Sequence, residues 1–184
     1  MSCSFLVIIM FIEMKKQRLN IKFGQAELWL RYDIQALYNI EDAGFYPFDV
    51  ISQSDNPKAI RCFLRNGLAD WYNSIEDSHS LDEYINGLMS AEGTQIDIIT
   101  FIHAAIVLSL PQSFASKKKN KKQPKFNILG LMTLFTDVMG APRSEFLSST
   151  LREATGRWER YAVAMGYQAP AEKFSSFEDD DDDE

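Results

Sequence analysis

Alternating apolar and polar positions near the beginning of the chain predict a β-hairpin. Residues 19–23 (LNIKF) place an apolar side chain at every second position, which is the spacing of a strand with one buried face. Gly24 and Gln25 follow as a turn signal, and residues 28–32 (LWLRY) give a second strand. Two strands joined by a short loop are therefore the first predicted element.

From Asp33 onward the spacing of the apolar residues becomes helical. Asp33 can cap a helix by accepting a hydrogen bond from a backbone N–H, and Gly44 suits the left-handed end of that helix. Asn56 and Pro57 are a capping residue and a first-turn residue for a longer helix. Two amphipathic helices are thus predicted after the hairpin.

Two further helices are predicted before residue 112. Ser80 and Glu83 form a capping box that opens one of them. Residues 94–110 are strongly apolar and predict the other. The length of this segment, together with Asp97 and His103, indicates a buried helix in a bundle and not a membrane span, which needs about 20 apolar residues.

A second group of helices follows residue 126. Residues 127–139 carry apolar side chains at helical spacing, and Gly140 is a good helix stop. Thr150 and Glu153 form a second capping box, for a helix that runs to about Met165. Because about 40 residues are marginal alone, we expect this module to dock on the first module, on a copy of itself or on a partner.

These elements predict a mainly α fold (α+β), in which an N-terminal β-hairpin packs on a small helical bundle. A flexible basic linker, a short helical module and a disordered acidic tail follow. The predicted boundaries are residues 1–13 for an extension that is not part of the fold, 14–112 for the first module, 113–125 for the linker, 126–166 for the second module and 167–184 for the tail.

The apolar residues 5–12 (FLVIIMFI) do not predict a membrane segment. Eight residues are too few to span a bilayer, and the flanking residues lack the basic start and the cleavage site of a signal peptide. Met14, which is followed by KKQRLNIKF, is a more natural start. We therefore expect residues 1–13 to be an upstream extension of the reading frame.

The net charge of the chain comes from its C-terminus. Apolar residues make up 46% of the chain, which is typical of a globular protein. The net charge is −7, and residues 178–184 (EDDDDDE) alone carry seven negative charges, so residues 1–177 are neutral overall. We expect the acidic tail to aid solubility or to keep off wrong partners, with docking on a basic partner as the alternative.

Six lysines between the two modules allow two interpretations. Taken alone, the run SFASKKKNKKQPK resembles a nucleic-acid patch, and phosphate contacts would give it a salt-dependent affinity. The run lacks interleaved arginines or aromatics for base contacts, and the rest of the chain is not basic, so we expect a flexible linker. The lysines are Lys117, Lys118, Lys119, Lys121, Lys122 and Lys125.

Residue types that support catalysis or metal binding are scattered along the chain. The two histidines lie 24 positions apart, and Cys3 and Cys62 have no spacing that suggests a zinc site or a disulfide framework. We find no phosphate-binding glycine loop, no dinucleotide fingerprint and no nucleophile-elbow or zinc-protease motif. We therefore expect no enzyme activity, no metal and no cofactor.

The first module resembles the opening of the tail assembly chaperones of long-tailed bacteriophages. In that family a hairpin with a glycine-containing turn leads into the pattern R-Y-D-hydrophobic-x-A-L-x-x-hydrophobic-E-D. Residues 19–44 are similar to this opening. The matching positions are Arg31, Tyr32, Asp33, Ala36, Leu37, Glu41 and Asp42.

The second module is independently similar to the short C-terminal segment of the same chaperones. There a glycine turn precedes the pattern E-F-x-x-x-T-x-x-E and a final helix. Residues 140–161 match it at Gly140, Glu145, Phe146, Thr150 and Glu153. The two segments together cover about half of the chain, and their order on either side of a basic linker is more specific than either alone.

This resemblance implies a function in the assembly of a phage tail. In lambda-type systems the first module is thought to coat the helical tape-measure protein, and the second recruits tail-tube subunits. Neither stays in the mature virion. The resemblance thus implies these two proteins as partners, possible self-association, no membrane, and the cytoplasm of a bacterial host. The alternative function is a nucleic-acid-binding or regulatory adaptor that uses the basic run Lys117–Lys125.

The chain departs from the family pattern in three ways. Both modules stand in one chain, the apolar prefix has no counterpart, and the EDDDDDE tail is unusual. In lambda-type systems ribosomal frameshifting adds the second module to the first. Lysine codons are rich in adenine, so Lys117–Lys122 are a candidate site for such a frameshift. A nucleotide sequence whose codons there all avoid runs of adenine would contradict this hypothesis.

A chaperone of this kind needs apolar grooves that hold a helix reversibly. The candidate surface in the first module is the apolar face of residues 94–110. The candidate side chains are Trp29, Trp71, Tyr72, Phe146 and Trp158. The other interpretation is that most of these side chains form the core of their own module. Phe146 and Trp158 are the better candidates, because so small a module cannot bury every apolar side chain.

Overall fold

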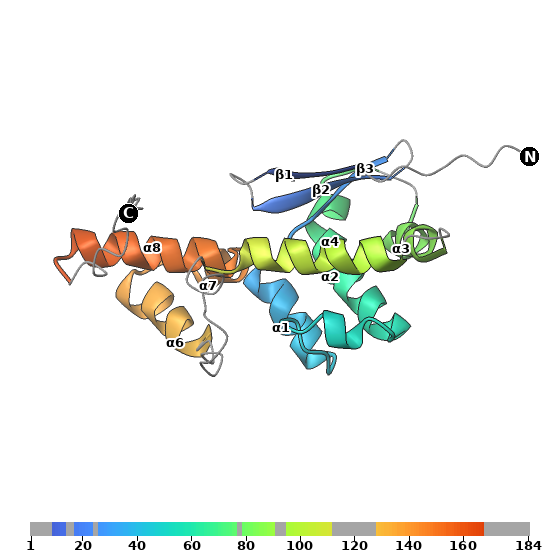
Figure 1. Cartoon of the computed structure of the whole chain (residues 1–184). Helices are drawn as coiled ribbons and strands as arrows, with labels where there is room; N and C mark the ends of the chain where they lie inside the picture. The colour runs from blue at the N-terminus through green and yellow to red at the C-terminus, as the bar shows by residue number, and fades with distance from the viewer. Residues whose placement is uncertain are drawn as a thin grey trace, which may run out of the picture.

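The computed structural model describes residues 9–13, 17–23, 26–76, 79–90, 95–111 and 128–167. It is mainly helical, with a small antiparallel sheet at the N-terminal end, and so confirms the predicted fold class. Figure 1 shows the sheet on one side of the molecule and the helices beneath it. The basic linker and residues 168–184 lie outside the described residues, so the predictions made for them are not tested.

The sheet contains the predicted hairpin and one further strand. Its strands are β1 (Ile9–Glu13), β2 (Arg18–Phe23) and β3 (Ala26–Leu30), in the antiparallel order β1-β2-β3. Leu19 lies opposite Leu30, and Ile21 lies opposite Leu28. All four side chains are buried, because this face of the sheet packs against helices α2 and α4.

Strand β1 corrects the prediction that residues 1–13 are not part of the fold. Ile12 lies opposite Leu19, and Glu13 lies opposite Arg18, so this segment extends the hairpin by one strand. In a two-stranded hairpin, the outer edge of β2 would have unpaired backbone N–H and C=O groups, and β1 pairs with this edge. A start of translation at Met14 stays a prediction.

In the described residues of the first module, five helical segments follow the sheet. They are α1 (Ile34–Asp42), the 3-10 helix η1 (Ile51–Gln53), α2 (Pro57–Asn73), α3 (Leu81–Ser90) and α4 (Gln95–Ser109). None of the helices in the described part of the chain is long and apolar enough to cross a membrane.

The predicted caps of α1 and α3 are confirmed. The Asp33 side chain accepts a hydrogen bond from the Ala36 N–H, and Gly44 ends α1 at a φ of +84°. At Ser80 the backbone N–H donates to the Glu83 carboxylate, and the Glu83 N–H donates to the Ser80 hydroxyl. These signals are confirmed because each depends on residues within one turn.

The second module contains α6 (Ile128–Thr133), the π-helix η2 (Leu134–Val138), α7 (Arg143–Leu147) and α8 (Leu151–Ala164). The described part of the predicted helix 127–139 is thus helical from 128 to 138, but its last turn widens into a π-helix. Gly140 follows with a φ of +68°, which is the conformation expected of a helix stop.

One continuous core joins the two modules. From the second module this core contains Leu131, Phe135, Phe146, Leu151 and Ala154, together with buried residues of the sheet and of α1–α4. The rings of Phe135 and Phe146 lie 5.4 Å apart between centroids. Of the three ways in which the second module was expected to gain stability, the structure shows docking on the first module.

Candidate functional site

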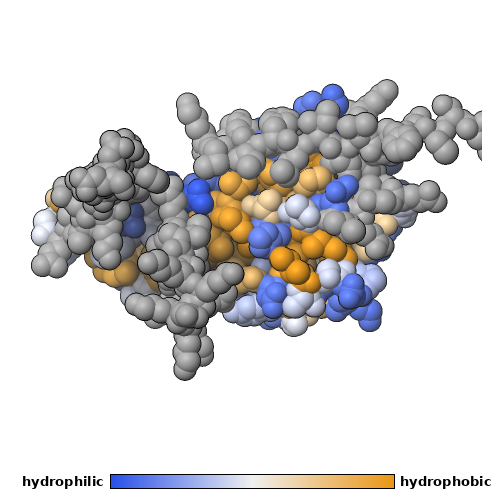
Figure 2. Space-filling view, in the orientation of Figure 1, coloured by the Kyte–Doolittle hydropathy of each residue, from blue (hydrophilic) through white to orange (hydrophobic). Residues whose placement is uncertain are grey.

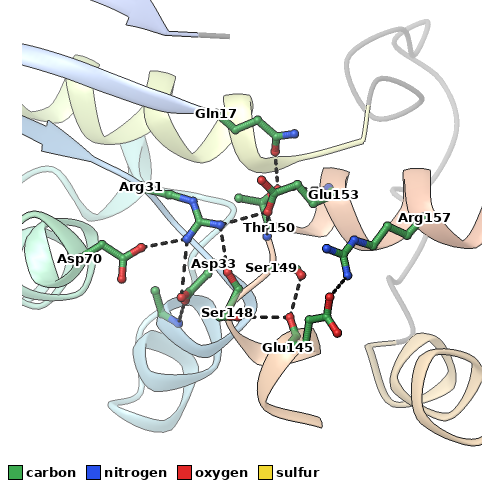
Figure 3. A network of polar contacts seen from close by, with 11 residues as sticks. Gln17, Arg31, Asp33, Asp70, Glu145, Ser148, Ser149, Thr150, Glu153 and Arg157 are labelled. Carbon is green, nitrogen blue, oxygen red and sulfur yellow. Dashed lines mark hydrogen bonds and ion pairs between the residues drawn. The ribbon is translucent and has the colours of Figure 1, made fainter. Parts of the chain in front are cut away.

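The two segments that carry the family resemblance meet at Arg31. Arg31 follows β3, and its Nη1 donates to Asp70 Oδ2 on α2 at 2.8 Å. Its Nη2 donates to the Ser148 carbonyl oxygen at 2.9 Å and to Glu153 Oε2 on α8 at 3.0 Å. Figure 3 shows the guanidinium between these groups. We call this cluster, with Asp33 and Thr150, the Arg31 junction.

Backbone hydrogen bonds fix the chain on both sides of Arg31. The Arg31 N–H donates to the Gly67 carbonyl oxygen of α2 at 2.9 Å. Three residues later, the Ile34 N–H donates to the Ser149 carbonyl oxygen at 2.9 Å. The segment between β3 and α1 is therefore bonded to α2 and to the turn before α8.

The capping box of α8 is part of the junction. Glu153 Oε2 accepts from the Thr150 N–H at 2.7 Å, and the same oxygen accepts from Arg31. The Thr150 hydroxyl accepts from the Glu153 N–H and donates to Gln17 Oε1. Glu153 thus completes the cap of α8 and joins this helix to the first module.

Burial and charge act against each other at the junction. Burial of Arg31 opposes its charge, but the hydrogen bond to Asp70 and the negative charge of Glu153 more than offset it and raise its pKa. Burial also raises the pKa of Asp33, although the hydrogen bond from the Ala36 N–H opposes this change. Arg31 is thus a permanent cation that partly compensates three carboxylates.

A second arginine joins the modules at the end of α4. Arg152 Nε donates to the Leu110 carbonyl oxygen at 2.8 Å. This carbonyl lies just beyond the C-terminus of α4, where the helix dipole favours a cation. In Figure 1, α4 and α8 lie end to end across the molecule.

Within the second module, Glu145 holds α7 against α8. Its carboxylate forms an ion pair with Arg157, and its carbonyl oxygen accepts from the Ser149 hydroxyl at 2.7 Å. The Arg157 guanidinium also lies 5.7 Å from the centroid of the Phe135 ring. Glu145 is therefore a structural residue of the turn that presents Ser148 to Arg31.

The structure brings some of the motif residues to the junction and places others elsewhere. Tyr32 is fully buried, and its hydroxyl donates to the Phe63 carbonyl oxygen at 3.0 Å. Ala36 and Leu37 face the core from α1. Glu41 and Asp42 are exposed at the other end of α1, away from the junction.

Two of the five candidate binding side chains are buried, which agrees with the other interpretation, that they belong to the core. Trp71 is 3% exposed, and its Nε1 donates to the Glu27 carbonyl oxygen. Phe146 is fully buried because the second module docks on the first, which supplies the cover that an isolated module would lack. In this fold, neither side chain is accessible to a partner.

The other three candidate side chains are half-buried. Trp29 lies under the Arg18 guanidinium, 4.3 Å from its carbon to the ring centroid. Tyr72 packs at the margin of the core, and Trp158 stacks on Tyr161 at 5.9 Å between centroids. The six lysines of the basic run lie outside the described residues.

The candidate apolar face of residues 94–110 is partly accessible. Val107 is exposed, and Ile99 and Ala104 are half-buried. Figure 2 shows apolar residues gathered on the face on which α4 lies in Figure 1, with hydrophilic residues among them. An apolar surface of this kind is suited to binding another protein.

In the described part of the chain, no group of three or more His, Cys, Asp or Glu side chains is arranged to hold a metal ion. Several residues that form these long-range contacts were not predicted from the sequence, because single polar residues carry no signal of distant pairing. They are Gln17, Asp70, Ser148 and Arg152.

Comparisons with known proteins identified no similar protein. A scan against models of protein families and searches of curated proteins and of solved structures found no match to the chain.

Thr150→Ala should lower the free energy of unfolding by about 1–2 kcal/mol, because it removes a buried helix cap. Ser80→Ala removes the equivalent cap from α3, where the capping residue is exposed, and should cost less, about 0.5–1 kcal/mol. Urea unfolding of both variants measures the difference. Equal losses would show that the Thr150 cap gains nothing from its place in the junction.

Proposed function

We propose that this protein is a tail assembly chaperone of a long-tailed bacteriophage. The observation that supports this proposal best is the contact between Arg31 and Glu153. Each belongs to a different one of the two segments that resemble these chaperones, and 122 positions separate them. Some of the residues chosen by resemblance thus form a single structural unit, as expected if the two segments belong to one functional protein. They are Arg31, Asp33, Thr150 and Glu153.

The proposed activity is reversible binding without catalysis or a cofactor. A tape-measure protein exposes long apolar helix faces until the tail tube encloses it, so it would aggregate unprotected. The first module would bind these faces, and the second would recruit tail-tube subunits. The protein would act in the cytoplasm of the bacterial host and be absent from the mature virion.

The shared core adds a mechanical element to the proposal. Two modules that share a core and the Arg31 junction would move as one body. A tape-measure segment on the first module and a tube subunit on the second would then be held at a fixed separation and orientation. Such positioning raises the effective concentration of one partner near the other.

Co-expression with the tape-measure protein of the same phage tests the proposal. We expect the soluble fraction of the tape-measure protein to increase several-fold with the full chain, and the two proteins to co-purify. An unrelated acidic helical protein expressed at the same level is the control. An unchanged soluble fraction would contradict the proposed function.

A further inference from the structure

Apolar side chains are unusually exposed around the C-terminal end of α1. Tyr38, Tyr46 and Ile51 are 58%, 54% and 63% exposed. The ring of Phe48, which is half-buried, packs edge-on against Tyr46 at 5.9 Å between centroids. We call residues 38–56, which run from the last turns of α1 to the start of α2, the α1 surface. It lies on the side of the helices away from the sheet (Figure 1).

The α1 surface carries only negative charge. Residues 38–56 contain four carboxylates and no basic side chain: Glu41, Asp42, Asp49 and Asp55. Glu41 and Asp42 stand in the last turn of α1, where the helix dipole disfavours an anion, and this turn contains no basic residue. Within the part of the chain that the structure describes, neither carboxylate forms a hydrogen bond or an ion pair.

This arrangement is unfavourable for the isolated chain. Exposed aromatic rings and unpaired carboxylates at the negative end of a helix both cost stability that a local change of sequence would recover. Such locally unfavourable residues are expected at functional sites, where a partner supplies the missing interactions. A cation of the partner near Glu41 and Asp42 would offset their repulsion from the helix dipole.

A hollow of about 210 Å³ adjoins the α1 surface where the loop reaches α2. Its lining combines the polar residues Ser54 and Asp55 with apolar side chains of three helices: Pro57, Ile60, Met89 and Ile98. The hollow is large enough to accept one apolar side chain, and the carboxylate of Asp55, which is exposed, can accept a cation there. Apolar lining with a few placed polar groups is typical of a binding site.

We propose that the α1 surface binds a basic amphipathic helix of a partner protein. The apolar face of that helix packs on Tyr38, Tyr46 and Ile51, and one of its apolar side chains enters the hollow. Lysines and arginines beside this face pair with the four carboxylates. Helix-in-groove binding of this type uses anchors at helical spacing, and opposite charge at the margin sets the orientation.

The described part of the chain offers few free cations of its own for the α1 surface. Six of its eight arginines already contact groups of their own fold. They are Arg18, Arg31, Arg61, Arg65, Arg152 and Arg157. The exposed Lys22, Lys58, Arg143 and Arg160 lie on four different elements. The lysine run Lys117–Lys125 lies outside the described residues, so pairing with a second copy through this run is an outcome that a measurement of self-association decides.

This inference rests on the proposed function for the source of the helix, which is the tape-measure protein. It goes further in naming the surface and the charge of the segment that is recognised. Its central test uses synthetic peptides, so it does not depend on that source.

The test measures binding of two labelled helical peptides to the full chain by fluorescence anisotropy. Both peptides have the same leucine face, and one carries lysines beside it where the other carries glutamates. We expect the lysine peptide to bind at least about tenfold more tightly at low salt, and to weaken as salt is added. Equal binding of the two peptides would overturn the proposal.

Variants locate the binding on the α1 surface. Glu41→Gln with Asp42→Asn should weaken the lysine peptide about tenfold, and Tyr38→Ser with Tyr46→Ser should weaken both peptides. The control, Glu27→Gln with Glu159→Gln, removes two exposed charges on β3 and α8, away from the α1 surface and the hollow, and should change nothing. Thermal unfolding verifies that each variant is folded, and a response of the control equal to that of the α1 variant would refute the site.

The outcomes separate this inference from the proposed function. Self-association that disappears in the Glu41→Gln, Asp42→Asn variant would make a second copy the occupant and overturn the inference. If the wild-type chain solubilises the tape-measure protein and this variant does so equally well, the inference fails alone. If the lysine peptide binds as expected but the tape-measure protein stays insoluble, the proposed function fails alone.

Discussion

Gly67→Ala should lower the free energy of unfolding by about 1–3 kcal/mol, although alanine is the better helix former by about 1 kcal/mol. A methyl group at Gly67 would lie 2.6 Å from Tyr32 Oη, 2.7 Å from Tyr32 Cζ and 3.0 Å from Leu30 Cδ2. Tyr32 cannot withdraw, because its ring is fully buried and its hydroxyl donates to the Phe63 carbonyl oxygen. Helix α2 would have to move from β3, which also strains the Arg31 N–H bond to Gly67.

Gly87→Ala is the matched control for this prediction. Gly87 also lies inside a helix, α3, but a methyl group there would meet no atom within 4 Å. Its replacement should therefore raise the free energy of unfolding by about 0.5–1 kcal/mol. Urea unfolding of both variants measures the two changes. Stabilisation by both would contradict the close approach of α2 to Tyr32.

The close approach at Gly67 marks the limit of what the sequence predicts. The caps at Asp33, Asn56 and Thr150 were predicted correctly, since each depends on neighbours within a turn. The sequence also predicted that α2 is amphipathic, and Gly67 lies on its buried face. The identity of the residue against which Gly67 packs depends on tertiary contacts, which no local pattern contains.

Predictions that depend on the whole fold were less accurate. Phe146 was expected to be accessible because its module is small, but the first module covers it. Residues 9–13 were expected outside the fold, but they form β1 through backbone bonds that any extended segment can make. In both cases the missing information was which segment packs next to which.

The candidate site was predicted in part for the same reason. Resemblance selected Arg31, Asp33 and Glu153, and the structure brings them together. Asp70 completes the cluster from an exposed position on α2, where an aspartate is ordinary. Glu41 and Asp42 were also selected, but they belong to another surface. The sequence thus indicated important residues, but it did not show that some belong to the Arg31 junction and others to the α1 surface.

Arg31→Met should lower the free energy of unfolding by about 2–3 kcal/mol, because it removes the cation from a group of three carboxylates. Methionine fills a similar volume, so the loss reports on charge and hydrogen bonds and not on packing. Asp33, Asp70 and Glu153 would then repel one another, and the Ser148 carbonyl oxygen would lose its donor. The value is below that of a fully buried pair because Asp70 and Glu153 are 46% and 32% exposed.

The local effect of Arg31→Met should be larger than its effect on the whole fold. Arg31 joins the second module to the first, so amide hydrogen exchange should accelerate in α7 and α8 before it does in α2. Arg65→Met is the control, because Arg65 forms an ion pair with Asp82 at the surface and its loss should cost less than about 1 kcal/mol. If the two variants lost equal stability, or exchange rose uniformly over the chain, Arg31 would stabilise the fold no more than a surface ion pair does, and the prediction would be wrong. The separate acceleration expected in α7 and α8 would instead identify the junction as the contact that holds the second module in place.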